Sequence, residues 1–339
     1  MSQQHRVAVI GGGSFGTAIA NIVADNGYPV CLWMRNTDRV EEVNSNHSNQ
    51  DYLPDIPLNP ALRASADLAE AVSGCDVVFV SVPSKSCREV AKQLSPLIAA
   101  GTMLISTTKG IESDSNQLMS EVLREEIPQA RIGVMSGPNL AKELAARSIT
   151  GTVIASEDED LNATIQDLLQ CGYFRVYAGN DIYGVELAGA LKNVYAIVAG
   201  LAAALDVGYN TISMLITRSL AEMSRYAVTK GADPLTFLGL AGVGDLFATC
   251  TSPLSRNYRV GYALGEGKNL DEVVAELGQV AEGVNTLKLL KKQSEELGIY
   301  MPLVNGLYDI IYNGRSIDEV IGNMMWAEQN RDVAFSLKA

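Results

Sequence analysis

Three glycines near the N-terminus are spaced so that they could hold a phosphate group. Gly11, Gly13 and Gly16 follow residues 7–10, an apolar run that indicates a buried strand. In this pattern the first glycine makes a tight turn, the second lets a pyrophosphate reach the backbone, and the third lets a helix pack closely on the strand. The N–H groups of the helix that opens near Ser14 would hold the phosphates. Between a strand and a helix, the motif predicts a dinucleotide site.

The end of the next apolar run bears on the choice of dinucleotide. Residues 29–34 indicate a second strand, and Arg35 follows it directly. A carboxylate about 20 residues after the glycines would bind the ribose 2′-hydroxyl of NAD, whereas an arginine suits the 2′-phosphate of NADP. Arg35 therefore favours NADPH over NADH. Tolerance of both cofactors stays open, as does a merely solvated charge at this position.

The scarcity of histidine narrows the chemistry. The chain contains two histidines, His5 and His47, one before the first strand and one in a polar loop. A Ser-His-Asp triad or a histidine-based dehydrogenase is therefore not expected, and neither is a metal site. A base that takes a proton from an alcohol would have to be a lysine, tyrosine, aspartate or glutamate.

Lys192 is the best candidate for that base. A helix is expected over residues 185–205, on which Lys192 lies on or near a stripe of small residues that includes Gly189, Ala196 and Gly200. Small residues there would let another element or a ligand approach closely. Desolvation would lower the pKa of the lysine toward that of a useful base. A lysine that snorkels from a core helix is the alternative.

Two further cationic positions could meet an anionic substrate. Lys109 follows an expected strand at residues 103–106, which places it at the sheet edge where open α/β sheets bind ligands. A second cation there would further depress the pKa of Lys192. Arg256 and Arg259 lie three residues apart, and arginine binds phosphate through two parallel hydrogen bonds. A solvated loop lysine and a solvated basic helix face remain the alternatives.

The elements that must position these residues change character along the chain. The expected strands are residues 7–10, 29–34, 76–82, 103–106, 132–135, 151–155 and 173–177. Because these runs are apolar and separated by helical segments, they predict a parallel sheet covered on both faces. The proline- and asparagine-rich residues 46–63 are expected to form a loop over the sheet edge.

The second half of the chain shows helical patterns and no convincing strand. The expected helices are residues 185–205, 214–230, 235–238, 255–264, 270–277, 285–297 and 303–312. The sequence thus predicts an α/β protein with an N-terminal Rossmann-type doubly wound sheet, followed by an all-α C-terminal domain. We expect residues 1–180 to bind the dinucleotide and residues 181–339 to bind the substrate.

Composition limits the partners and the compartment. The 339 residues carry a formal net charge of −13, which argues against binding to nucleic acid or to an anionic membrane surface. The longest uncharged helical stretch, residues 193–205, is shorter than the about 20 residues that span a bilayer. Five scattered cysteines without CxxC spacing suggest reduced, mostly buried thiols and a cytoplasmic location.

Taken together, the motifs resemble the bacterial-type NAD(P)-dependent sn-glycerol-3-phosphate dehydrogenases. The resemblance runs from Val9 to about Asn313 and rests on ordered blocks at residues 11–18, 108–112, 136–138, 191–194, 242–246, 255–257 and 278–283. It implies reversible hydride transfer between glycerol 3-phosphate and dihydroxyacetone phosphate. It also implies a cytoplasmic homodimer that supplies glycerol 3-phosphate for phospholipid synthesis.

The resemblance carries roles onto matching positions. Lys192 would accept the proton in the oxidative direction, and Lys109 would assist at the reacting oxygen. Substrate-binding positions would be Lys109, Gly137, Asn139, Lys192, Asp245, Ser255, Arg256 and Asn257. Cofactor-binding positions would be Gly11, Gly13, Ser14, Phe15, Gly16, Arg35, Lys109, Ala141, Arg256, Val280 and Glu282.

One position departs from the family pattern. The family commonly has serine or threonine where this chain has Asn139, which can still cap the following helix and donate a hydrogen bond. Two other functions remain open from the residues alone. One is another 6-phosphogluconate or β-hydroxyacid-type dehydrogenase, which should differ at residues 108–110 and 244–245. The other is a non-catalytic NAD(P) sensor, which would not need Lys109, Lys192, Asp245 and Arg256 together.

Overall fold

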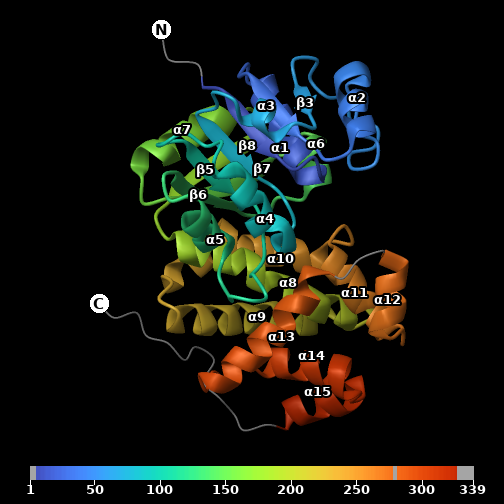
Figure 1. Ribbon diagram of the computed structural model, residues 1–339. Coiled ribbons are helices and arrows are strands. Elements are labelled where there is room, and N and C mark those ends of the chain that lie inside the picture. The colour runs from blue at the N-terminus through green and yellow to red at the C-terminus, as the bar shows by residue number, and fades with distance from the viewer. Residues whose placement is uncertain (1–4, 278–280, 327–339) are drawn as a thin grey trace. The chain divides into compact units, whose positions relative to one another are not determined.

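The computed structural model describes residues 5–277 and 281–326. The chain divides into two compact units, Met1–Glu186 and Leu187–Ala339 (Figure 1). The first unit is built on one eight-stranded sheet, and the described part of the second unit consists of helices. The predicted Rossmann-type sheet followed by a helical C-terminal region is therefore confirmed.

The sheet has the order β3-β2-β1-β4-β5-β6-β7-β8. Its strands are β1 (Val7–Ile10), β2 (Val30–Trp33), β3 (Arg63–Ser65), β4 (Val77–Val80), β5 (Met103–Ser106), β6 (Arg131–Ser136), β7 (Thr150–Ala155) and β8 (Phe174–Gly179). Strand β1 lies between β2 and β4, so the direction of winding reverses beside it. The loop after β1 therefore lies at the switch point where doubly wound sheets bind their ligands.

Helices cover both faces of the sheet, as the apolar strands predict. They are α1 (Ser14–Asp25), α2 (Thr37–Asn46), α3 (Leu68–Val72), α4 (Ser84–Leu94), α5 (Met119–Glu126), α6 (Ala141–Ala145) and α7 (Glu159–Leu169). Successive strand residues point to opposite faces. Val7 and Val9 pack in one core with residues of α1 and α7, whereas Ala8 and Ile10 pack in another with residues of α4 and α5.

The direction of the last two strands differs from the expected all-parallel sheet. Strand β7 pairs with β6 in antiparallel register, and β8 runs parallel to β7. The connection between β6 and β7 contains only one short helix. Helix α6 has five residues and rises about 7 Å, whereas a six-residue strand is about 20 Å long, so no helix spans the way back along β6. The chain therefore turns and runs back beside β6.

Residues 46–63 form the expected loop for most of their length, but the edge strand that follows was missed. Strand β3 has three residues and pairs with β2 through Ala64 and Leu32. On its other side, the side-chain amide of Asn44 donates to the Ala64 carbonyl at 2.9 Å and accepts from its N–H at 2.8 Å. A side chain thus replaces a neighbouring strand, and no apolar pattern in the sequence signals such a contact.

The helices of the second part of the chain mostly follow the prediction. They are α8 (Ile182–Ala204), α9 (Tyr209–Thr229), the 3₁₀ helix η1 (Pro234–Leu238), the π-helix η2 (Leu240–Gly244), α10 (Asp245–Thr251), α11 (Arg256–Gly265), α12 (Leu270–Leu277), α13 (Glu282–Glu296), α14 (Pro302–Asn313) and α15 (Ile317–Met325). Three of them, η2, α10 and α15, were not predicted. Helix η2 lies within the glycine-rich residues 239–244 and α10 follows them, and helical periodicity is weak in such a segment.

Helix α8 is the central helix of this region, and glycines let other helices approach it closely. A methyl group on Gly200 would lie 1.9 Å from the Tyr258 carbonyl oxygen, and one on Gly261 would lie 1.8 Å from that of Ile197. The backbones of α8 and α11 therefore touch. Helix α11 thus lies beside the small-residue stripe at Gly200, where a close approach of another element or a ligand is expected.

Helix α8 is longer than the uncharged stretch noted in the sequence. Its 23 residues have a mean hydropathy of 1.5 over the most apolar window, which makes it long and apolar enough to cross a membrane. However, 83% of that window is buried inside the protein. This burial is typical of the core helix of a folded domain.

The cysteines are less buried than expected. All five lie in described ranges and form no disulfide there; Cys87 and Cys250 are buried, and the other three are half-buried. Burial raises the pKa of both buried thiols to about 12. Neither thiol is therefore ionised near neutral pH.

Candidate active site

The glycine turn after β1 has the backbone geometry that the motif predicts. Gly11 has a φ of +118°, and a methyl group there would lie 2.5 Å from the Ser81 carbonyl oxygen. A methyl group on Gly16 would lie 2.0 Å from the Gly11 carbonyl oxygen, so helix α1 rests directly on the turn. Within the described residues, nothing lies within 4 Å of the corresponding position on Gly13. Two glycines are thus required by the fold, and the third faces open space.

The start of helix α1 fits a pyrophosphate. Gly13 is its N-cap, and no side chain of the described ranges caps its first N–H groups. Uncapped N–H groups and the positive end of the helix dipole attract a phosphate. The Ser14 hydroxyl donates to the Tyr52 carbonyl at 2.8 Å, and Phe15 packs against the core.

Asn49 fixes the glycine turn and was not predicted from the sequence. It is fully buried, and its side-chain amide donates to the Gly12 carbonyl at 3.1 Å and to the Thr17 hydroxyl at 2.9 Å. It therefore ties the turn to the first turn of α1. A single asparagine in a polar loop carries no signal that could have revealed this contact.

Arg35 lies just beyond the end of β2 and is exposed. The next residue, Asn36, caps α2 by accepting hydrogen bonds from the N–H groups of Asp38 and Arg39. Arg39 forms an ion pair with Asp51 at 2.6 Å. Arg35 is thus an exposed cation at the carboxyl edge of the sheet, beside the glycine turn.

Lys109 lies at the same edge, three residues after the end of β5. Its amine donates to the Gly137 carbonyl, which follows β6, at 3.1 Å. Strands β1 to β6 are parallel, so their carboxyl ends meet at one edge. The structure therefore brings the glycine turn, Arg35, Lys109 and Gly137 to one edge of the first unit.

Asn139 does not cap the next helix, contrary to expectation. The N-cap of α6 is Leu140, and the Asn139 amide donates instead to the Thr152 hydroxyl on β7 at 2.8 Å. The expected hydrogen bond exists, but it holds the turn after β6 against β7. Ala141 is the first residue of α6 and is half-buried.

Lys192 forms a buried ion pair with Asp245 in the second unit. The two side chains are 7% and 1% exposed, and the Lys192 amine also donates to the Thr249 hydroxyl at 2.7 Å. Thr249 in turn donates to the Asp245 backbone carbonyl at 2.6 Å. The carboxylate supplies the counter-charge that a buried ammonium group needs. The expected burial of Lys192 is present, and it does not snorkel to the surface.

Thr249 was missed as a member of this region, and Asn193, which lies in the block at residues 191–194, was given no role in the site. Asp245 and Thr249 are one helical turn apart on α10, a helix that was not predicted. Asn193 accepts from the Asn257 side-chain amide at 3.0 Å, and the Asn257 oxygen accepts from the Gly283 N–H at 3.0 Å. These contacts join α8, α11 and α13 next to Lys192.

The other predicted residues of the second unit lie at helix starts. Ser255 is the N-cap of α11 and accepts from the Tyr258 N–H at 3.3 Å, and Arg256 is the first residue of that helix and exposed. Glu282 is the first residue of α13. Val280 lies outside the described residues.

A buried carboxylate supports the helix that carries Lys192. The Tyr195 hydroxyl, on α8, donates to Glu222 at 3.2 Å. Glu222 also accepts from the N–H groups of Leu303 and Val304 at the start of α14. Burial raises the pKa of Glu222 to about 7, although the hydrogen bonds that the carboxylate accepts lower it in part. Glu222 thus joins α8, α9 and α14.

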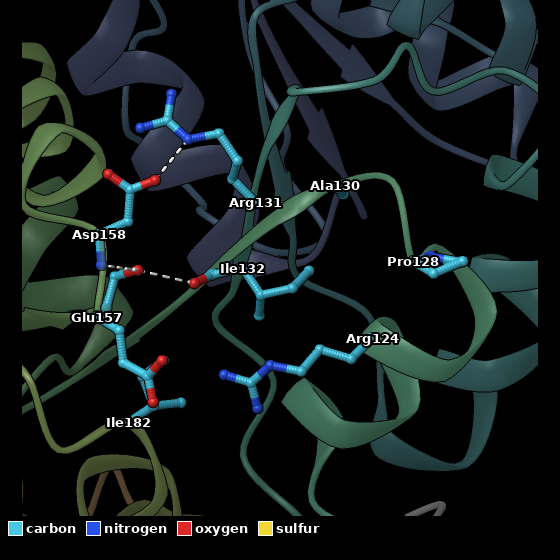
Figure 2. Close-up of a pocket in the computed structure, with 9 residues that line it drawn as sticks. Arg124, Pro128, Ala130, Arg131, Ile132, Glu157, Asp158 and Ile182 are labelled. Carbon is cyan, nitrogen blue, oxygen red and sulfur yellow. Dashed lines mark hydrogen bonds and ion pairs between the residues drawn. The ribbon is translucent and has the colours of Figure 1, made fainter.

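The cavity in Figure 2 lies away from the predicted site residues of the first unit. Its volume is about 380 Å³, and it lies at the amino end of β6. It is lined by Arg124, Pro128, Ala130, Arg131, Ile132, Ser156, Glu157, Asp158 and Ile182. Arg131 is paired with Asp158 at 2.5 Å (Figure 2). Within the described residues this cavity contains no predicted site residue.

A doubly wound sheet whose glycine turn opens onto an uncapped helix binds a dinucleotide. Joined to a helical region with a buried lysine, it defines a dinucleotide-dependent dehydrogenase. Residues 6–162 match the family model for the N-terminus of NAD-dependent glycerol-3-phosphate dehydrogenase, and residues 181–322 match that for its C-terminus. The chain belongs to this family and has glycerol-3-phosphate dehydrogenase [NAD(P)+] activity.

Relatives with this name cover nearly the whole chain. The glycerol-3-phosphate dehydrogenase [NAD(P)+] of Pseudomonas fluorescens is 55% identical over 99% of this chain and 94% of its own length. That of Saccharophagus degradans is 53% identical over 98% and 93%. The crystal structure of glycerol-3-phosphate dehydrogenase from Coxiella burnetii has a TM-score of 0.89 and 36% identity, and covers 96% of this chain and 99% of that one. Both alternatives, another dehydrogenase type and a non-catalytic sensor, are thereby set aside.

Proposed function

We propose that the chain catalyses reversible hydride transfer between sn-glycerol 3-phosphate and dihydroxyacetone phosphate, with NADPH as the favoured cofactor. The observation that carries this proposal is the buried pair of Lys192 and Asp245. In a chain with two histidines, a lysine held in place by a carboxylate is the group best suited to move the proton. The bound nicotinamide supplies or accepts the hydride.

Each residue then has a defined task. Lys192 takes the proton from the C2 hydroxyl in oxidation and returns it in reduction. Asp245 and Thr249 hold its amine in one orientation through the contacts described above. Lys109 places a second cation at the reacting oxygen, where negative charge develops during reduction.

The substrate phosphate is bound by cations and helix starts. Arg256 provides a planar pair of donors at the start of α11. Ser255 and Asn257 flank it, and Gly137, Asn139 and Asp245 are further substrate positions. The −13 net charge of the chain makes such local cations necessary for binding an anion.

The cofactor positions follow the glycine turn. Gly13 lets the pyrophosphate approach the start of α1, Gly11 and Gly16 shape the turn that receives it, and Ser14 and Phe15 lie beside it as further cofactor positions. Arg35 binds the ribose 2′-phosphate that distinguishes NADPH. The remaining cofactor positions are Lys109, Ala141, Arg256, Val280 and Glu282. We assign residues 1–180 to the dinucleotide-binding domain and residues 181–339 to the substrate-binding domain.

The cellular setting is also a proposal. The enzyme acts as a homodimer in the cytoplasm and reduces dihydroxyacetone phosphate to supply glycerol 3-phosphate for phospholipid synthesis. This setting is supported by the family resemblance and by the burial of α8, which favours a core helix over a membrane span.

A spectrophotometric assay of dihydroxyacetone phosphate reduction tests the proposal. We expect oxidation of both NADPH and NADH, with a higher kcat/KM for NADPH. Lys192→Ala should lower kcat by about 10²- to 10⁴-fold, the range typical of a lost proton-transfer group. Its affinity for NADPH, measured by fluorescence titration, should stay unchanged. Full activity in this variant would contradict the role of Lys192.

A further inference from the structure

Lys109 lies between two anchored segments of the chain. Before it, the Thr108 hydroxyl donates to the Val82 carbonyl at 2.8 Å. After it, residues 111–118 form a small hairpin, closed by a bridge between Ile111 and Leu118. The backbone at Lys109 thus runs directly into this hairpin, while its amine donates to the Gly137 carbonyl.

Arg88, on α4, contacts both arms of the hairpin. Its Nε and Nη2 atoms donate to the two carboxylate oxygens of Glu112, each at 2.8 Å. Its Nη2 atom also donates to the Gln117 side-chain oxygen at 2.6 Å. Glu112 and Gln117 face each other across the hairpin, since the Glu112 N–H donates to the Gln117 carbonyl at 2.9 Å. One guanidinium group thus joins the two arms to each other and to α4.

Several carboxylates around Arg88 depend on its positive charge. Glu125 and Glu126, on α5, also pair with it, at 3.1 and 2.5 Å. Three carboxylates therefore share one guanidinium group, and without it they would repel one another. Hydrogen bonds from Arg88 and Ser115 hold the pKa of Glu112 below its ordinary value. The Arg88 and Glu112 side chains are 24% and 17% exposed, so solvent screens the pair only in part.

We infer that Arg88 is a positioning residue for Lys109, acting through the hairpin at residues 111–118. This inference rests on the proposed role of Lys109 at the reacting oxygen. Misplacing a catalytic group by about 1 Å can cost about a hundredfold in rate, so a loosened hairpin should reduce turnover without any lost contact to the substrate.

The first test measures the hairpin itself by amide hydrogen exchange. In Arg88→Gln we expect the amides of Glu112 and Asn116, which bond across the hairpin, to exchange at least about tenfold faster. Exchange in β1 should not change. Glu112→Gln leaves Arg88 with two carboxylates and provides a milder second variant if Arg88→Gln does not fold. Unchanged hairpin exchange in the folded variants would overturn the inference.

The matched control is Arg131→Gln. Arg131 also pairs with two carboxylates, those of Asp158 and Asp160, and is 30% exposed. It lies at the amino end of β6, away from Lys109. This variant should leave both hairpin exchange and activity unchanged.

The second test is a double-mutant cycle that uses kcat/KM for dihydroxyacetone phosphate. We expect Arg88→Gln to lower this value about tenfold when Lys109 is present. Arg88→Lys keeps the positive charge but lacks the planar set of guanidinium donors, and it should lower the value less. In a Lys109→Ala background Arg88→Gln should have little further effect, because the group that it positions is gone. An equal loss in both backgrounds would overturn the inference. Full activity of Lys109→Ala alone would instead refute the proposed role of Lys109, and the exchange experiment would still decide whether Arg88 holds the hairpin.

Discussion

Lys192 and Asp245 are 53 residues apart in the chain and form an ion pair that is almost entirely buried. Taking two charges out of water is costly, and their attraction offsets that cost only when the geometry is good and the remaining donors are satisfied. Thr249 satisfies one further donor of the lysine. The protein thus keeps the Lys192 amine at a fixed place and out of bulk water.

Asp245→Asn should destabilise the protein strongly. The substitution leaves the Lys192 ammonium group buried without its counter-charge, which typically costs about 3–5 kcal/mol. Thr249→Val removes one hydrogen-bond partner and should cost only about 1 kcal/mol. Urea unfolding at neutral pH measures both. Equal losses in the two variants would show that the ion pair is not the dominant interaction.

Glu222→Gln should change how stability depends on pH. Glu222 has a pKa of about 7 in the folded protein and an ordinary pKa of 4.5 in the unfolded protein. Between pH 4.5 and about pH 7, the folded protein therefore binds the Glu222 proton more tightly than the unfolded protein does. The stabilisation from this proton is complete below pH 4.5 and is lost as pH rises through about 7. The wild type should therefore lose up to about 3 kcal/mol relative to Glu222→Gln across this window.

Urea unfolding at several pH values checks this result. A difference between the two proteins that does not vary with pH would contradict the assignment. Glu186→Gln provides an independent repeat, because burial also raises the pKa of Glu186 to about 7. Ser120 at the start of α5 donates to that carboxylate at 2.9 Å through its N–H.

Gly13→Ala and Gly16→Ala should separate binding from folding. Gly13 has ordinary extended geometry and faces open space, so alanine there should leave the melting temperature unchanged. Its methyl group would occupy the approach of the pyrophosphate, and we expect KM for NADPH to rise at least about tenfold. On Gly16 the methyl group would collide with the Gly11 carbonyl, so this variant should melt at a clearly lower temperature. Similar melting temperatures would contradict the distinction.

Arg35→Ala should reduce the preference for NADPH. Loss of a charged hydrogen bond to the 2′-phosphate should lower kcat/KM with NADPH about tenfold and leave that with NADH nearly unchanged. Arg63→Ala is a suitable control, because Arg63 is also exposed but starts the neighbouring strand at the opposite edge of the sheet. An equal loss of kcat/KM with NADPH and with NADH would show that Arg35 does not bind the 2′-phosphate.

The sequence by itself determined the features that depend on local patterns. The glycine turn and most of the strands follow from spacing and polarity within a few residues, whereas the burial of Lys192 was left open against snorkelling. Gly11 has a positive φ in the turn itself, and Gly16 contacts the Gly11 carbonyl within the same turn and helix, so the motif specifies both glycines directly.

Only the tertiary structure decided which distant residues meet. No local pattern relates the residues that form three of these contacts. They are the ion pair of Lys192 with Asp245, the hydrogen bonds of Asn49 to the glycine turn, and the hydrogen bonds of Arg88 to the hairpin. The reversal at β7 belongs to the same class, because no pattern within β6 or β7 specifies the direction in which the two strands pair. Such contacts follow from chain length and packing in three dimensions, whereas periodicity reports only which face of an element is buried.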